Sequence, residues 1–181
     1  MNYKVLSDKQ PWAWLICAGL KDIENRSWRC PQKYIGERIL IHASANKVKY
    51  DNWYDSELDN NQLLALPWEC DCKFEYGAII GSVIIADCIN YHPSIWAIPG
   101  QWHWVLKYPI LFNKPILNVK GKLGFWDYKL ELCHICGQPA EYECDICEKY
   151  CCDNHNTPYN QFTQIDYNCC CNCGEAKNEE Y

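Results

Sequence analysis

Alternating apolar and polar positions predict a series of short strands along the first two thirds of the chain. The clearest is the ERILIHA segment, Glu37–Ala43, which is rich in β-branched residues. The longest apolar run, Gly77–Ile89, predicts a central strand that is bulged or bent at its internal Gly81. The further strands that this pattern predicts cover residues 3–7, 22–28, 101–107 and 111–119.

Two segments have the pattern of helices. In residues 11–19 a proline stands early, where a helix needs no N–H donor, and Gly19 stands near the end. Residues 51–66 place leucines at helical spacing among acids and amides, and we expect this helix to lie over one opening of a barrel. Five or six strands with only two helices lack the rhythm of a parallel α/β sheet. The sequence therefore predicts a mostly β fold, a small and mainly antiparallel barrel.

The composition changes abruptly after about residue 132, where Cys, Asn, Asp and Glu become dominant. We therefore expect two domains, a β-barrel over residues 1–130 and a small module over residues 131–181. The first holds 15 Lys and Arg against 13 Asp and Glu (+2), and the second holds 2 against 10 (−8). A nucleic acid would meet little long-range attraction, so its binding must be local, in a pocket or groove.

The first residues, Met1–Val5, lack the apolar run of a secretory signal, and no stretch reaches the roughly 18 apolar residues that cross a bilayer. These features indicate a soluble, cytoplasmic protein with no membrane partner. Thiols stay reduced in that compartment, so the 15 cysteines favour metal binding over disulfides. A secreted, disulfide-rich protein is the alternative.

Eight of the C-terminal Cys and His residues form four pairs with two residues between the members. The pairs are Cys133/Cys136, Cys144/Cys147, Cys152/His155 and Cys170/Cys173. A two-residue spacer lets a tight turn aim both side chains at one ion, and four pairs make two tetrahedral Zn²⁺ sites. Protein ligands fill every position, so we expect structural ions. The module has too little apolar sequence to fold without them.

The separations between the pairs resemble those of B-box-like cross-brace zinc fingers. This resemblance implies that the first and third pairs share one ion and that the second and fourth pairs share the other. Site one then contains Cys133, Cys136, Cys152 and His155, and site two contains Cys144, Cys147, Cys170 and Cys173. Neighbouring residues that could replace a ligand are His134, Cys151, Cys169 and Cys171. The acidic charge of the module favours a protein partner, because phosphate would be repelled.

The segment GLKDIENR, Gly19–Arg26, has the pattern G-x-K-x-x-E-x-R. Together with Gln10–Trp12 before it and Leu40–Ser44 after it, this segment resembles the ASCH family. Later segments fall where such domains have their last strands: GAIIG at 77–81, QWHWVL at 101–106 and GKLGFW at 121–126. The resemblance covers residues 3–130 and implies a PUA-like β-barrel.

The three charged residues of this motif can meet at one place. Lys21 stands where the first helix ends, and Glu24 and Arg26 share one face of the following strand, so their charges can converge at the mouth of a cleft. The alternative is that Lys21 only complements the helix C-terminus while Glu24 and Arg26 form a solvated ion pair.

A flat, polar ligand would suit such a cleft. Cationic groups of the motif would meet a phosphate, a carboxylate or amide would pair with a base edge, and an indole would stack on a ring. The ligand-binding residues that we expect are Trp12, Lys21, Glu24, Asn25, Arg26, Trp28, His42 and Ser44, with Trp104 as another possible stacking face.

ASCH proteins and their PUA-like relatives are associated with RNA binding and modified-base recognition, which implies RNA or a modified nucleotide as the ligand. Some members are ribonucleases, and some small ones are amidohydrolases of acetylated cytidine that use a Lys with a Thr and a Glu. Lys21 matches that Lys, but Glu24 stands in the Thr position, so the hydroxyl nucleophile is missing. A metal-free ribonuclease could draw on Lys21, Glu24, His42 and His103.

Binding is therefore the leading interpretation. If the protein is instead a hydrolase acting at the same cleft, Lys21 and Glu24 are its expected catalytic residues. A third hypothesis is that both halves of the chain are protein-interaction modules.

Overall fold

The computed structural model describes residues 1–47, 58–66, 74–156, 168 and 170–173. The chain divides into two compact units. Tyr3–Tyr128 form the first, which we term the barrel unit, and Met1–Asn2 with Lys129–Tyr181 form the second, which we term the cysteine-rich unit.

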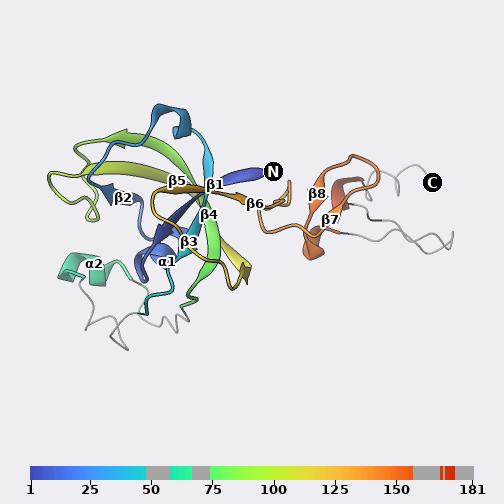
Figure 1. Cartoon of the computed structure of the whole chain (residues 1–181), viewed down its shortest axis with the longest axis horizontal. Coiled ribbons are helices and arrows are strands. Elements are labelled where there is room, and N and C mark those ends of the chain that lie inside the picture. The colour runs from blue at the N-terminus through green and yellow to red at the C-terminus, as the bar shows by residue number, and fades with distance from the viewer. Residues whose placement is uncertain (48–57, 67–73, 157–167, 169, 174–181) are drawn as a thin grey trace. The chain divides into compact units, whose positions relative to one another are not determined.

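Six strands pair into one mixed sheet in the order β2-β5-β4-β3-β1-β6 (Figure 1). β1 runs parallel to β3, whereas β3–β4, β4–β5 and β2–β5 are antiparallel pairs. The strands are β1 Asn2–Asp8, β2 Ile23–Arg26, β3 Arg38–Ala43, β4 Ala78–Ile89, β5 Trp102–Ile116 and β6 Phe125–Lys129. The predominance of strands confirms the mostly β class predicted from the sequence.

Aromatic contacts connect the two edges of this sheet. Phe125 of β6 stacks on Trp104 of β5, with ring centroids 5.4 Å apart and planes 16° apart. The same phenyl ring lies 5.9 Å from the ring of Trp28, just beyond β2. Because β6 and β2 are the two edges of the strand order, these contacts curl the sheet into a barrel.

The helix α1, Trp12–Cys17, packs closely on the sheet at Gly81 of β4. A Cβ at Gly81 would lie 2.3 Å from the Ile110 carbonyl oxygen and 2.6 Å from Cys17 Sγ, so only glycine permits this approach. The register of β4 also shifts between Ile79 and Gly81, which confirms the predicted bulge.

β5 is one continuous strand, so the expectation of separate strands at 101–107 and 111–119 is wrong. Pro109 lies inside β5, where it cannot donate a ladder hydrogen bond. A bulge accommodates it: Tyr108 has a φ of 50°, and the register with β4 shifts between Ser82 and Ile84. The proline bends the strand without ending it.

Of the helix expected over residues 51–66, residues 51–57 lie outside the described residues. The described part contains α2, Asn60–Leu64, which begins with a capping box between Asp59 and Gln62. A 3₁₀ turn, η1 Gln32–Tyr34, lies between β2 and β3. Within the described residues, no helix has both the length and the apolar character needed to cross a membrane.

The cysteine-rich unit has little regular structure. β7, Tyr142–Glu143, pairs with β8, Tyr150–Cys151, and the 3₁₀ turn η3, Asp153–His155, follows. Its buried core is made of thiols: Cys133, Cys144, Cys151, Cys152 and Cys170. A core of this kind buries little hydrocarbon, so other bonds must hold the unit together.

Candidate ligand site and metal centres

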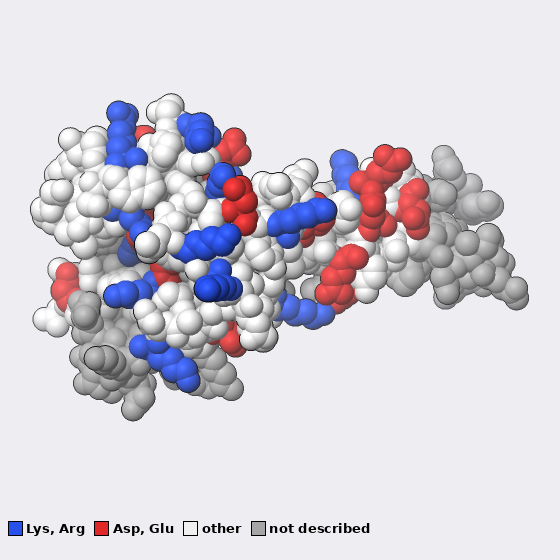
Figure 2. All heavy atoms as spheres, in the orientation of Figure 1, with Lys and Arg blue, Asp and Glu red and all other residues white. Residues whose placement is uncertain are grey.

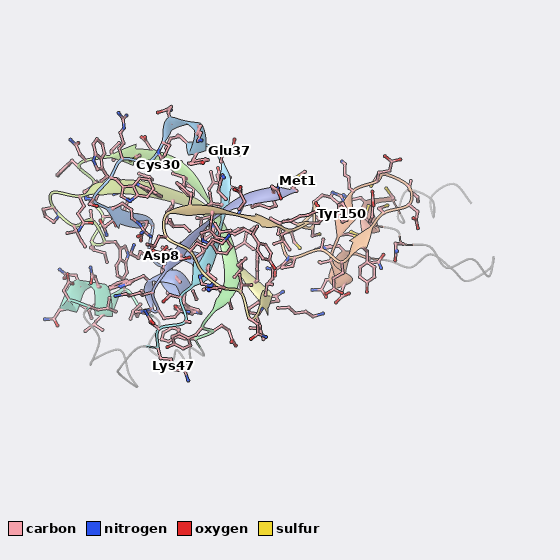
Figure 3. The ribbon with its side chains drawn as sticks, viewed as in Figure 1. Met1, Asp8, Cys30, Glu37, Lys47 and Tyr150 are labelled. Atoms are coloured by element: carbon pink, nitrogen blue, oxygen red, sulfur yellow. The ribbon has the colours of Figure 1, made fainter. Side chains whose placement is uncertain are left out.

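Four charged residues of the barrel unit form one network, which we term the charged quartet: Asp8, Lys21, Glu24 and Arg26. Asp8 ends β1 (Figure 3), Lys21 lies in the turn after α1, and Glu24 and Arg26 lie on β2. Since successive strand residues alternate between faces, Glu24 and Arg26 share a face, as their spacing predicts.

Glu24 stands between the two cations of the quartet. Lys21 Nζ lies 2.9 Å from Glu24 Oε2 and also donates to the Ile23 carbonyl oxygen. Arg26 Nε lies 2.9 Å from Glu24 Oε1, and Arg26 Nη2 donates to Asp8 Oδ1. Each cation therefore has an anionic partner, as buried charges require.

The quartet is largely removed from solvent. Lys21 is 5% exposed and Glu24 and Asp8 are each 7% exposed, whereas the Arg26 side chain keeps 23% of its surface. The alternative of a solvated Glu24–Arg26 ion pair is therefore wrong. Arg26 is the member of the quartet that reaches solvent.

Asp8 is a member of the site that the sequence analysis missed. Burial raises the pKa of its carboxyl to about 7, and repulsion from Glu24 adds to this effect, while Arg26 and Lys21 oppose it. The available signal was weak, a single acid at the end of an apolar strand. An acid that titrates near neutral pH is characteristic of functional sites.

Two indoles contact cations of the quartet and a third packs against one of them, and the three differ in exposure. Lys21 Nζ lies 6.0 Å from the ring centroid of Trp12, and Arg26 Cζ lies 6.0 Å from that of Trp104. Trp104 is fully buried and offers no free face to a ligand. Trp28, which packs edge-on against Trp104, is 37% exposed, and Trp12 is partly exposed.

Asn25 is occupied within the protein. Its Nδ2 donates to the Trp96 carbonyl oxygen at 2.8 Å, and its Oδ1 accepts from the Ile98 N–H at 2.9 Å. Both functions of the amide thus hold the loop before β5 against β2. A base edge would have to displace these bonds to use Asn25.

The structure does not bring His42 to the quartet. His42 pairs with Ser7 on the β1–β3 ladder, and Ser7 is one position before Asp8. The side chains of His42 and Asp8 therefore point to opposite faces of the sheet. Its Nε2 lies 2.9 Å from the Val119 carbonyl oxygen, and burial lowers the pKa of the ring. Gly121 covers it so closely that a Cβ there would lie 2.6 Å from His42 Cε1.

Two other polar residues lie near this end of the sheet. The Ser44 N–H donates to the Asp8 carbonyl oxygen at 2.8 Å, and the Ser44 hydroxyl has no partner among the described residues. His103, a candidate for the ribonuclease alternative, is 3% exposed and bonds the Ile98 carbonyl oxygen at 2.9 Å. Ser44 thus adjoins the quartet through its backbone, and His103 supports the same loop as Asn25.

In the cysteine-rich unit, the ligands gather into two groups whose donor atoms all lie within 4.8 Å of one another. One group is Cys133, Cys136, Cys152 and His155, and the other is Cys144, Cys147, Cys170 and Cys173. Both agree with the cross-brace arrangement that the pair spacing resembles. Cys151 and Cys171 belong to neither group, and Cys169 lies outside the described residues.

The distances suit tetrahedral metal sites. Cys136 Sγ and Cys152 Sγ are 3.7 Å apart, and so are the Sγ atoms of Cys147 and Cys170. A tetrahedron with metal–sulfur bonds of about 2.3 Å has edges of about 3.8 Å. His155 completes site one with its Nδ1 atom, 3.4 Å from Cys152 Sγ. These two groups could each hold a metal ion.

Two of the thiols have lowered pKa values that favour the thiolate form. Burial by itself raises the pKa of Cys133, but backbone N–H groups of Cys136, Cys152 and Ile135 overcome it and bring the pKa to about 6. Burial likewise opposes ionisation of Cys144, and backbone N–H groups again bring its pKa to about 6. Each site therefore contains a thiol that ionises readily, and the thiolate is the form that binds metal.

Comparison with known proteins agrees with this fold. A model of the ASCH domain matches residues 6–116, more than half of the 181 residues. Activating signal cointegrator 1 of Homo sapiens and of Mus musculus are 26% and 25% identical to this chain over 133 residues. Those alignments cover 65% of this chain and 22% of each relative, so the chain spans about a fifth of their length. The chain belongs to the ASCH domain family.

Proposed function

We propose that the barrel unit binds RNA or a modified nucleotide at the charged quartet. The observation that carries this proposal is that Arg26, which contacts two buried carboxyl groups, is the cation of the network that reaches solvent. A guanidinium fixed in this way is oriented for a phosphate before the ligand arrives. Trp28 and Trp12 supply partly exposed rings on which a base can stack.

In this proposal the members of the quartet have different tasks. Arg26 contacts the ligand, Glu24 contacts Arg26, and Lys21 in turn contacts Glu24. The nearly balanced charge of residues 1–130 agrees with local recognition, because no broad basic surface is needed. Asn25 acts on the protein side by fixing the loop of Trp96 and Ile98.

The test is fluorescence anisotropy with a labelled single-stranded RNA, using Arg26→Lys. Lysine keeps the charge but loses the forked donor pair, so we expect affinity to fall by about tenfold or more. Arg29→Gln is the control, since it removes a whole charge from an exposed neighbouring position. Equal losses in both variants would show that the RNA senses general charge and that this assignment of the site is wrong.

A hydrolase at the same site is the second candidate, and Asp8 is the observation that favours it. An acid with a pKa of about 7 can donate or accept a proton at neutral pH. Incubation with labelled RNA and with acetylated cytidine tests this function. Turnover that Lys21→Ala and Asp8→Asn both abolish would support the enzyme, and saturable binding without turnover would support the reader.

We propose further that the two Cys and His groups bind Zn²⁺ as structural ions and that the cysteine-rich unit contacts protein. Closed sets of four ligands support the first statement, because they leave no position for a catalytic water. Exposed acids support the second, and Figure 2 shows acidic side chains on the visible face of this unit. Elemental analysis should find about two zinc ions per chain, and one ion or none would contradict the assignment.

A further inference from the structure

A single guanidinium holds two carboxyl groups in the barrel unit. Arg26 Nη2 contacts Asp8 Oδ1, and Arg26 Nε lies 2.9 Å from Glu24 Oε1. The Asp8 and Glu24 side chains are 8% and 9% exposed. Asp8 Oδ2 has no hydrogen-bond partner among the described residues. Two carboxyl groups so close together in a buried site do not both ionise readily, and such pairs retain a proton near neutral pH.

Charged and titratable groups from three parts of the fold surround Asp8. Glu24 and Arg26 face it from β2, and Lys21 acts on it from the turn after α1. Cys17 of α1 stays a neutral thiol, because burial raises its pKa well above the ordinary value. Fully ionised, the two acids cancel Lys21 and Arg26, so the quartet has no net charge. One added proton gives it a single positive charge.

We infer that Asp8 and Glu24 share one proton and that the protonated pair frees Arg26 to bind one phosphodiester anion. The inference rests on the proposed function, whose ligand class it specifies. A phosphodiester carries one negative charge and therefore matches the singly protonated quartet. When the proton leaves, Asp8 becomes an anion that competes with phosphate for Arg26. Ligand binding thus takes up a proton and weakens as the pH rises.

The first test needs no ligand. A ¹³C NMR titration of the side-chain carboxyl carbons in the full, zinc-loaded chain should show Asp8 and Glu24 responding together, with a midpoint near pH 7. Asp8→Asn should remove this step. If both carboxyls of the unmodified protein titrate below about pH 5, as free acids do, the shared proton is refuted.

The second test measures binding of the dinucleoside monophosphate UpU, whose one phosphodiester keeps its charge across the pH range. Affinity should fall about tenfold between about pH 6 and pH 8, the linkage expected for one proton with a pKa near 7. The deoxy dinucleotide TpT should show the same slope, since the linkage comes from the phosphate. Uridine, which has no phosphate, should show none.

The variants separate this inference from the proposed function. Asp8→Asn keeps a neutral side chain at Arg26, so it should retain the low-pH affinity at both pH values. Asp127→Asn, which removes an exposed carboxylate from β6, should keep the pH slope. Binding that is insensitive to pH, or a slope that survives in Asp8→Asn, would overturn the inference alone. If none of these ligands binds at either pH, the proposed function is overturned as well.

Discussion

Replacing Asp8 by Asn should change how the stability of the barrel unit depends on pH. The native pKa of Asp8 is about 7, against an ordinary value of 3.8. The native state therefore binds more protons than the unfolded state between these values, and the free energy of unfolding falls as the pH rises. The stabilisation from this group is complete below about pH 4 and is lost as the pH rises through about 7.

The magnitude follows from the size of the shift. Each pKa unit corresponds to about 1.4 kcal/mol, so the full difference is about 4 kcal/mol. Between about pH 5 and pH 8, the contribution of Asp8 to the free energy of unfolding should decrease by about 3 kcal/mol. Asn cannot ionise and has no such contribution, so the variant should gain about 3 kcal/mol relative to the unmodified protein over this interval.

Urea unfolding followed by tryptophan fluorescence is a suitable assay, because all nine Trp residues lie within residues 1–130. The quantity to compare is the difference in unfolding free energy between Asp8→Asn and the unmodified protein at each pH. Asp127→Asn, which removes an exposed carboxylate from β6, controls for the loss of one negative charge. A difference for Asp8→Asn that stays constant with pH would refute the reasoning, since Asp8 would then be ionised throughout.

Three further predictions concern packing, metal and the loop before β5. Gly81→Ala should lower the free energy of urea unfolding by about 2–3 kcal/mol, because its Cβ would meet Cys17 Sγ at 2.6 Å. An unchanged free energy would show that α1 can move away from β4 without cost. Cys136→Ser should lower zinc content while Cys171→Ser leaves it unchanged, and the tryptophan unfolding transition should stay the same in both if the two units fold independently. Asn25→Ala should lower the free energy of unfolding by about 1–3 kcal/mol and speed hydrogen exchange at the Ile98 amide. Unchanged exchange would mean that the loop before β5 keeps its structure without the Asn25 hydrogen bonds.

Local spacing explains what the sequence could predict about the sites. Glu24 and Arg26 are two residues apart on a strand, so their shared face follows from strand geometry alone. The two-residue spacers of the candidate metal ligands likewise act within single turns. Both patterns need only the nearest few residues, and the described structure contains both.

Long-range pairing explains what the sequence could not predict. Asp8 reaches Arg26 only because β1 pairs in parallel with β3 and the sheet then curls, a consequence of contacts far apart in the chain. The position of His42 is a matter of register, since a shift of one residue would exchange its face with that of Ala43. Pro109 was misleading for a similar reason: whether a proline ends a strand depends on a bulge, which sequence pattern alone does not reveal.

The contacts of Glu24 favour one of the two proposed chemistries. A hydroxyl residue is expected at this position in the amidohydrolases of the family. Glu24 lacks that nucleophilic hydroxyl, and its carboxylate also makes contacts of its own. Its two oxygens hold Lys21 and Arg26, each at 2.9 Å, and the Lys21 ammonium also donates to the Ile23 carbonyl oxygen. A catalytic lysine must present its amino group to the substrate, whereas the Lys21 ammonium is buried and bonded within the protein. The same carboxylate contacts Arg26, whose side chain keeps 23% of its surface exposed, so the residue that weakens the case for catalysis by Lys21 strengthens the case for anion binding by Arg26.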